Sequence, residues 1–210
     1  MTESNTKHTG ENEFSQPPAE LLSRIQLLQT VRKLKTLTGI PVYEKAHIEI
    51  IKQDPPNLYP IALYALNKTL ERIRSTQAKL ASFGWDVFNL NCAVSFTPRE
   101  LGSKIVISPP IVEWSESDRV PLVVDGLHRI LLAFLEKKQI NCIYIEGVDP
   151  SLVPISFPVS WDQIKIIENP PSDPVERRIL RPGINIYSPE VSTRYRDFSP
   201  LGSLGRRPME

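Results

Sequence analysis

Apolar residues recur at helical spacing in two stretches of the chain. The first begins at Pro17 and stops before Gly39, and its apolar positions are Leu21, Leu22, Ile25, Leu28 and Val31. The second begins near Ile61, and its apolar positions are Leu63, Leu66, Leu70, Ile73 and Leu80, with Gly84 as the expected C-terminal cap. Proline suits a first helical turn and glycine the position after the last, so the pattern predicts two amphipathic helices.

Shorter apolar runs predict strands over residues 46–52, 105–107, 111–114, 120–124 and 140–145. The runs VPLVV at 120–124 and INCIYI at 140–145 are continuous, which is typical of strands covered on both faces. Between them, residues 130–137 predict a third, strongly apolar helix. The pattern over 85–97 is mixed and indicates no definite element. We expect a compact fold of the α/β (α+β) class with a small mixed sheet.

The two ends of the chain differ in composition from its middle. Residues 1–16 are mostly polar, and we expect a disordered leader. Residues 170–210 hold seven prolines and no apolar periodicity, and from Arg177 onward there are seven arginines, no lysine and three acidic residues. We therefore expect four parts: the leader, a helix with its linker at 17–45, a domain at 46–169 and a Pro/Arg-rich extension at 170–210.

The net charge of the chain limits which charged partners, such as nucleic acid, its surface can bind. The 25 Lys and Arg residues balance 24 Asp and Glu residues, which leaves a net charge of +1 and excludes a basic surface spread over the whole molecule. The arginines between Arg177 and Arg207 have three interpretations: a local contact for nucleic acid, a belt that docks on acidic groups of the protein itself, or a flexible tail. No stretch approaches the roughly 18 apolar residues of a membrane span, so we expect no membrane partner.

Cysteine usage bears on compartment and metal chemistry. Cys92 and Cys142 lie fifty positions apart with no CxxC spacing, which excludes a disulfide framework and disfavours a zinc site. With no apolar signal segment at the N-terminus, two thiols indicate a cytoplasmic protein. Walker A, HExxH and GxSxG patterns do not occur in the sequence.

The strongest candidate for chemistry is the turn Asp125-Gly126-Leu127-His128-Arg129, which joins a predicted buried strand to the third helix. A helix N-terminus presents unpaired N–H groups and the positive end of its dipole, so it attracts anions. Gly126 allows a positive φ or a close backbone approach, and Arg129 adds a guanidinium suited to phosphate. His128 can donate hydrogen bonds or take a proton. Asp125 can bind Mg²⁺ or cap the helix.

The block around this turn resembles the ParB/sulfiredoxin superfamily. The resemblance lies in a Pro-Ile strand at 109–112, a second strand at 121–124 and the DGLHR turn at 125–129. It implies a nucleotide phosphate bound by Gly126, Leu127, His128 and Arg129. Sulfiredoxins have their catalytic cysteine inside this turn, where the present chain has Leu127, and ParB proteins continue into a DNA-binding helix-turn-helix that this sequence does not show.

The turn is nearest in motif to the free-serine kinases of that superfamily, which carry a DGHxR-type turn. This resemblance implies a phosphotransferase that moves phosphate from ATP or ADP, with CTP as a further candidate, to a small hydroxyl-bearing acceptor with the help of Mg²⁺. Asp125 and His128 would be catalytic residues, and Glu49 and Glu113 are candidates for a general base outside the turn. The alternative is a nucleotide-responsive adaptor or nuclease-associated module that binds nucleic acid through the arginines of the extension.

Overall fold

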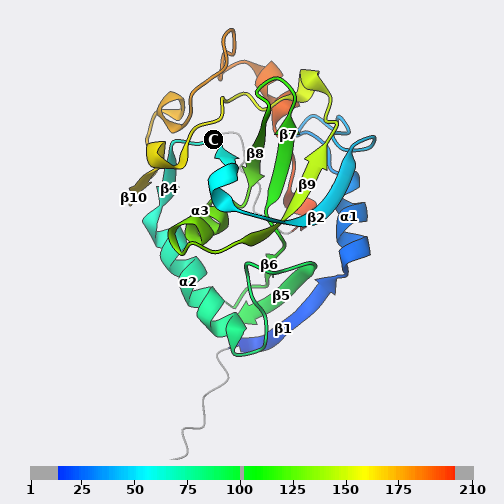
Figure 1. The fold of residues 1–210 in the computed structure, drawn as a ribbon, viewed down its shortest axis with the longest axis vertical. Helices are drawn as coiled ribbons and strands as arrows, with labels where there is room; N and C mark the ends of the chain where they lie inside the picture. Colours follow the sequence, from blue (N-terminus) through cyan, green and yellow to red (C-terminus); the bar gives the residue numbers. More distant parts are fainter. Residues whose placement is uncertain (1–13, 100–101, 202–210) are drawn as a thin grey trace, which may run out of the picture.

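A mixed sheet of five strands forms the centre of the molecule (Figure 1). The computed structural model describes residues 14–99 and 102–201. The strand order is β2 (His47–Gln53), β9 (Ile140–Glu146), β7 (Ile111–Ser115), β8 (Val120–Asp125) and β3 (Tyr59–Pro60). β9 pairs in parallel with β7 and β3 with β8, while the other two pairings are antiparallel. The small mixed sheet that the sequence predicts is confirmed.

Both faces of this sheet are covered, as the continuous apolar runs in β8 and β9 predict. The helices α2 (Asn67–Ala81) and α3 (Leu127–Leu135) share one buried cluster with Val112, Val123 and Cys142. The helix α1 (Arg24–Arg32) shares a second cluster with Ile111, Ile143 and Ile145, which alternate with the first set along the strands. Figure 1 accordingly shows α1 on the opposite flank from α2 and α3.

The N-terminal segment corrects two expectations. Residues Phe14–Leu22 form β1, the edge strand of a second sheet with β5 (Ala93–Pro98) and β6 (Ile105–Ile107). The helix predicted from Pro17 begins only at Arg24, where Ser23 and Gln26 form a capping box. Prolines donate no backbone hydrogen bond, and an edge strand with register shifts tolerates them. Residues 14–16 of the expected leader thus belong to a strand, and the rest of the leader lies outside the described residues.

The second predicted helix is also shorter than expected. It begins at Asn67 rather than near Ile61, because Tyr64–Leu66 forms β4, which pairs in parallel with β10 (Lys165–Ile167). Its predicted end is confirmed: Gly84 has φ +79°, its N–H donates to the carbonyl of Ala81, and the N–H of Trp85 donates to Leu80. These two bonds form a Schellman motif, which requires the left-handed conformation that glycine adopts without strain.

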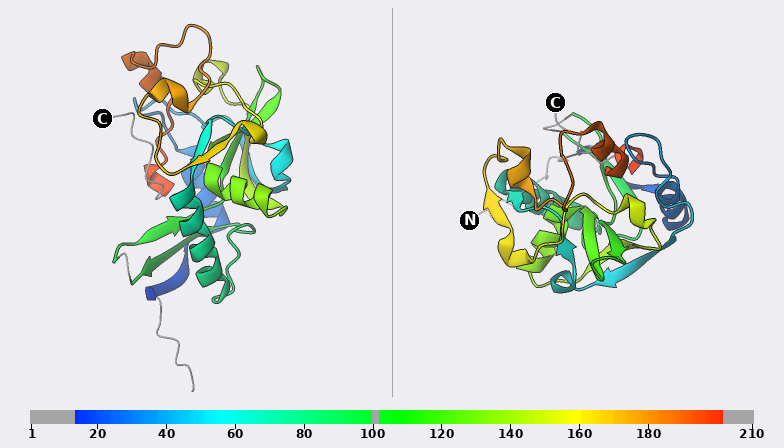
Figure 2. Two further views of the ribbon diagram at one scale, coloured as in Figure 1. Left: turned by 90° about the vertical axis from the view of Figure 1, so that its left-hand side faces the viewer. Right: turned by 90° about the horizontal axis from the view of Figure 1, so that it is seen from above.

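The Pro/Arg-rich extension lies against the domain (Figure 2). It runs through three short 3-10 turns, Pro174–Arg177, Pro189–Arg194 and Ser199–Leu201. Phe198 and Leu201 are buried and join the cluster that contains α1. The remaining 3-10 turns are Pro55–Asn57, Pro150–Leu152 and Trp161–Gln163.

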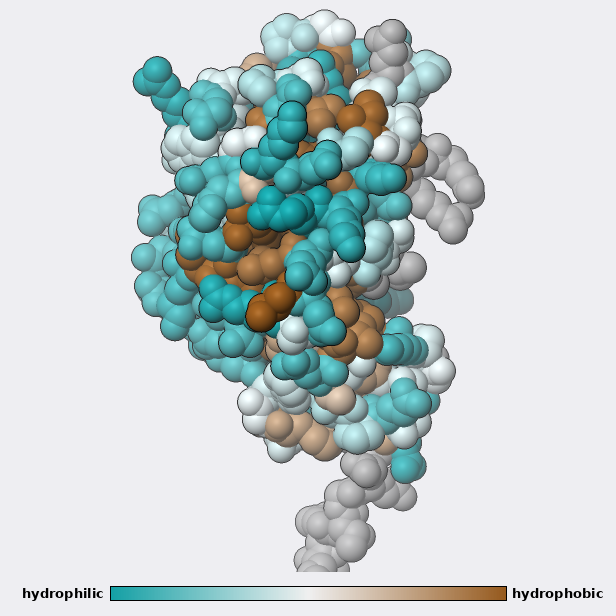
Figure 3. Space-filling view, turned by 90° about the vertical axis from the view of Figure 1, so that its right-hand side faces the viewer, coloured by the Kyte–Doolittle hydropathy of each residue, from teal (hydrophilic) through white to brown (hydrophobic). Residues whose placement is uncertain are grey.

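The flank that carries α1 exposes apolar surface between hydrophilic side chains (Figure 3). Ile25 on α1 is 70% exposed and Leu21, just before it, is 39% exposed. None of the helices in residues 14–99 and 102–201 is long and apolar enough to cross a bilayer.

Candidate functional site

Gly126 makes the turn between β8 and α3 sterically feasible. It is the N-terminal cap of α3 and has φ +81°. A Cβ atom at this position would lie 2.7 Å from the Cβ of Pro110. The two reasons expected for glycine at this position are therefore confirmed: the backbone is left-handed, and Pro110 approaches too closely for a side chain.

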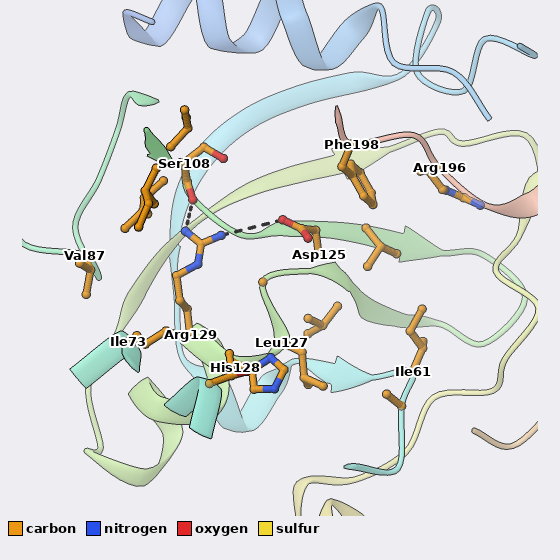
Figure 4. A pocket seen from close by; sticks show the side chains of 18 of the residues that line it. Ile61, Ile73, Val87, Ser108, Asp125, Leu127, His128, Arg129, Arg196 and Phe198 are labelled. Carbon is orange, nitrogen blue, oxygen red and sulfur yellow. Dashed lines mark hydrogen bonds and ion pairs between the residues drawn. The ribbon is translucent and has the colours of Figure 1, made fainter. Parts of the chain in front are cut away.

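The N-terminus of α3 opens into a cavity of about 750 Å³ (Figure 4). Its walls come from the turn itself, from α2, from β6 with the residues before it, and from residues 154–156, 194–196 and 198. In Figure 4, Ile73 and Val87 lie on one side of the Asp125–Arg129 pair and Phe198 lies on the other. The cavity thus has an apolar region on each side of the helix N-terminus, a size and lining that suit an organic ligand with a charged group.

Arg129 points into the structure from the first turn of α3. Its Nη1 donates to the carbonyl of Ser108, and its Nη2 lies 3.9 Å from Oδ2 of Asp125. The side chain is 12% exposed, and burial lowers the pKa of Arg129 from its usual value, while the Asp125 carboxylate acts in the opposite direction. Two of its neighbours therefore fix the guanidinium at the cavity wall, beside the open helix end.

His128 connects the turn to a second helix. Its Nε2 accepts a hydrogen bond of 2.9 Å from the backbone N–H of Leu66, the N-terminal cap residue of α2. A ring nitrogen that accepts carries no proton, so this imidazole is the neutral Nδ1–H tautomer. The structure thus places His128 at the cavity wall with Nε2 already bonded within the protein.

Cationic side chains predominate in the cavity. Arg72 on α2, Lys104 before β6, and Arg194 and Arg196 in the extension line it together with Arg129. Asp125 is the one carboxylate among the described lining residues. The cavity therefore carries an excess of positive charge, which favours an anionic ligand. The sequence does not single out Arg72 or Lys104, because the segments that carry them are brought together only by the fold.

The two glutamates proposed as general bases do not line the cavity. Glu49 lies on β2, where its Oε1 is 3.7 Å from Nε2 of His47, and both side chains are largely exposed. Glu113 on β7 is buried and accepts hydrogen bonds from Tyr43 and Arg196. Its carboxylate therefore makes structural hydrogen bonds inside the protein and does not reach the cavity.

The Glu113 carboxylate also shifts the pKa values of its two partners. Burial raises the pKa of Tyr43, and the Glu113 carboxylate raises it further. Burial alone would lower the pKa of Arg196, but the adjacent Glu113 carboxylate outweighs that effect and raises it. Arg196 therefore stays charged and paired.

A magnesium site would depend on Asp125. The described residues hold no group of three or more His, Cys, Asp or Glu side chains suited to a metal ion. Mg²⁺ at phosphate sites is usually bound by one or two carboxylates together with phosphate oxygens and water. A single carboxylate beside a helix N-terminus is consistent with that mode, so Asp125 would be the protein ligand of a Mg²⁺ ion that is bound together with a phosphate group.

Comparison with known proteins agrees with this architecture. The chain matches the family model of the ParB CE domain over residues 20–165, which is more than half of its length. No curated protein and no solved structure gives a significant match. The matched range contains the whole five-stranded sheet, the three helices and the DGLHR turn, and it ends before the extension. The chain therefore belongs to the ParB CE domain family, within the ParB/sulfiredoxin-like superfamily.

Proposed function

We propose that the protein binds a nucleotide in this cavity and transfers phosphate from ATP or ADP to a small hydroxyl-bearing acceptor. The observation that carries the proposal is the helix N-terminus of α3, which opens at a left-handed glycine into a cavity lined by five cationic side chains and one carboxylate. Helix N-termini bind phosphate through N–H groups and the dipole, and the surrounding cations add to that attraction.

The residues divide into two roles in this proposal. The N–H groups at the start of α3 and the guanidinium of Arg129 hold the phosphates and offset the charge that spreads over the transferred group. Mg²⁺ supplies further charge neutralisation, and Asp125 would hold it. A bond forms between the acceptor oxygen and the transferred phosphorus, the bond from phosphorus to the nucleotide breaks, and the hydroxyl proton passes to Asp125. Positioning provides most of the catalysis in phosphoryl transfer, so one carboxylate suffices.

Calorimetric titration of the chain with MgATP, MgADP and MgCTP tests the binding step. We expect Arg129→Ala to weaken binding by about 1.5–3 kcal/mol, the usual worth of a hydrogen bond to a charged group. Arg74→Ala is the matched control, because Arg74 is an exposed residue of α2 that does not line the cavity. Equal affinity of the wild-type chain and Arg129→Ala would reject the assignment. A screen of phosphate transfer to small alcohols and amino acids then tests the reaction.

The alternative function, an adaptor that binds nucleic acid through the extension, draws less support from the geometry. Arg181 and Arg196 both bind carboxylates of the domain, Asp118 and Glu113 respectively. This is the arrangement expected of a belt docked on the protein's own acidic groups. Salt-dependent binding of a DNA duplex, lost when the arginines between Arg177 and Arg207 are neutralised, would favour the adaptor instead.

A further inference from the structure

The extension carries an arginine that takes no part in docking the extension on the domain. Five arginines of the extension lie within the described residues. Four of them donate side-chain hydrogen bonds: Arg177 to the carbonyl of Pro171, Arg178 to the hydroxyl of Tyr195, Arg181 to Asp118 and Arg196 to Glu113. The side chain of the fifth, Arg194, has neither a hydrogen bond nor an ion pair within the described residues. Docking on the domain therefore accounts for four arginines and leaves Arg194 unexplained.

The backbone around Arg194 has a fixed position. The next residue, Tyr195, accepts a hydrogen bond of 2.9 Å at its carbonyl from the N–H of Leu37. The carbonyl of Arg194 accepts a bond of 2.6 Å from Nη1 of Arg196, whose Nε and Nη2 bind the buried Glu113. Arg194 is thus carried by a segment that is anchored to the domain, although its own guanidinium is not used for that purpose.

Arg194 lines the same cavity as the N-terminus of α3. Two of the five cationic side chains of this cavity, those of Arg129 and Arg196, lie beside a carboxylate. The other three have no ion pair within residues 14–99 and 102–201: Arg72, Lys104 and Arg194. Arg72 and Lys104 are exposed, whereas Arg194 is half-buried. Water screens a partly buried charge less, so the charge of Arg194 acts on a bound anion with less screening than the other two.

The chemistry and the place of Arg194 suit phosphate groups. A guanidinium is planar and can donate two parallel hydrogen bonds to phosphate oxygens. Figure 4 labels Arg196 and Phe198, which mark the segment that carries Arg194, on the other side of Asp125 from Arg129. Cations therefore reach one cavity from two different walls, which suits a ligand with several negative charges, such as the phosphate chain of a nucleotide.

We infer that Arg194 binds the phosphate chain of the nucleotide, so that the extension completes the proposed phosphate site. The inference rests on the proposed function, and it adds to that site a residue outside the range 20–165 that the family model matches. A nucleotide that contacts both α3 and Arg194 binds the form in which the extension is docked. Because such coupling is reciprocal, the nucleotide stabilises the docked extension and the docked extension strengthens nucleotide binding.

The test compares MgATP with magnesium tripolyphosphate, which carries the phosphates without a nucleoside. Both are titrated into the full chain, into Arg194→Ala and into Arg177→Ala. Arg177→Ala is the matched control, because it removes the same charge from the extension at a residue that does not line the cavity. We expect Arg194→Ala to bind both ligands about tenfold more weakly or worse, as the loss of a charge-assisted hydrogen bond gives, and Arg177→Ala to bind them as the wild type does. The melting temperature of ligand-free Arg194→Ala should equal that of the wild type.

Four results would overturn the inference. If MgATP binds Arg194→Ala as tightly as wild type while Arg129→Ala weakens it, the inference fails and the proposed function stands. If Arg194→Ala weakens MgATP but not tripolyphosphate, the guanidinium contacts the nucleoside instead of the phosphates. If ligand-free Arg194→Ala melts as far below the wild type as Arg196→Ala does, the role of Arg194 is structural. If the wild-type chain binds neither ligand, the inference and the proposed function fail together.

Discussion

Arg196 and Glu113, 83 positions apart in the sequence, form a two-point ion pair in the protein interior. The Arg196 Nε lies 2.8 Å from Oε1 of Glu113 and its Nη2 lies 2.6 Å from Oε2, and each side chain is 3% exposed. Glu113 belongs to β7 of the central sheet, and Arg196 belongs to the extension. The pair therefore joins the extension to the family domain at a point where water does not screen the charges.

Removing one charge of this pair should destabilise the fold strongly. Glu113→Gln leaves Arg196 buried without its counter-charge, and breaking a buried pair in this way costs about 3–5 kcal/mol. Urea unfolding of the wild type and the variant measures the difference. Glu116→Gln is the control, because Glu116 is exposed and its substitution should change the free energy of unfolding by about 0.5 kcal/mol or less. Similar effects of the two substitutions would contradict the structural role assigned to the pair.

Gly126→Ala should be far more damaging than alanine at another left-handed glycine. At Gly126 the added Cβ would meet Pro110 at 2.7 Å, whereas at Gly147, with φ +78°, no atom lies within 4 Å. Backbone strain alone accounts for about 1 kcal/mol at Gly147, and the collision at Gly126 should bring its loss to about 3 kcal/mol or more. Thermal unfolding of both variants gives the comparison, and equal losses would mean that the turn can move away from Pro110.

The Arg181–Asp118 pair should make stability depend on pH in the acidic range. The pKa of Asp118 is lowered in the folded protein, so the unfolded chain takes up the proton first as pH falls. Its contribution is therefore fully present above the unfolded value of about 3.9 and is lost as pH falls through the lower folded value. The difference in unfolding free energy between wild type and Asp118→Asn should accordingly shrink between about pH 5 and pH 2. A constant difference across that range would refute the pairing.

Neither cysteine should react with alkylating reagents in the folded protein. Burial raises the pKa of Cys142 to about 12, with the nearby Arg129 acting in the opposite direction, and burial also raises that of Cys92. The thiolate is the reactive form, so at pH 8 we expect iodoacetamide to modify both residues only after denaturation. Mass spectrometry of native and urea-treated samples reads this out. Rapid native labelling of Cys142 would show that the strand β9 opens readily.

The sequence predicts β8, α3 and β9 well because the patterns that mark these elements lie within each element. Continuous apolar runs mark β8 and β9, and the DGLHR turn marks the start of α3. β1 is predicted wrongly as helix because the apolar residues from Leu21 onward have helical spacing. Leu21 and Leu22 are nevertheless extended, because they belong to the strand that pairs with β5. β5 itself gives no clear pattern because five of its six side chains are buried, so polar and apolar positions do not alternate.

The candidate site is predictable only in part. Asp125, Gly126 and Arg129 stand together in the sequence, and their turn has a recognisable composition. The bond from Arg129 to Ser108 and the burial of Ser156 arise from segments that meet only in the folded chain. No local pattern reports such contacts, which is why the cavity lining at residues 154–156, 194–196 and 198 has no counterpart in the sequence-based prediction.

The hydrogen bond between Leu66 and His128 links the beginnings of two helices that border the same cavity. A ligand that displaces the first turn of α3 must either break this bond or carry the start of α2 along with it. The side chains of Thr69, Arg72, Ile73 and Thr76 would then shift together with the DGLHR turn. Any movement of the DGLHR turn is thereby coupled to the start of α2 through the imidazole of His128.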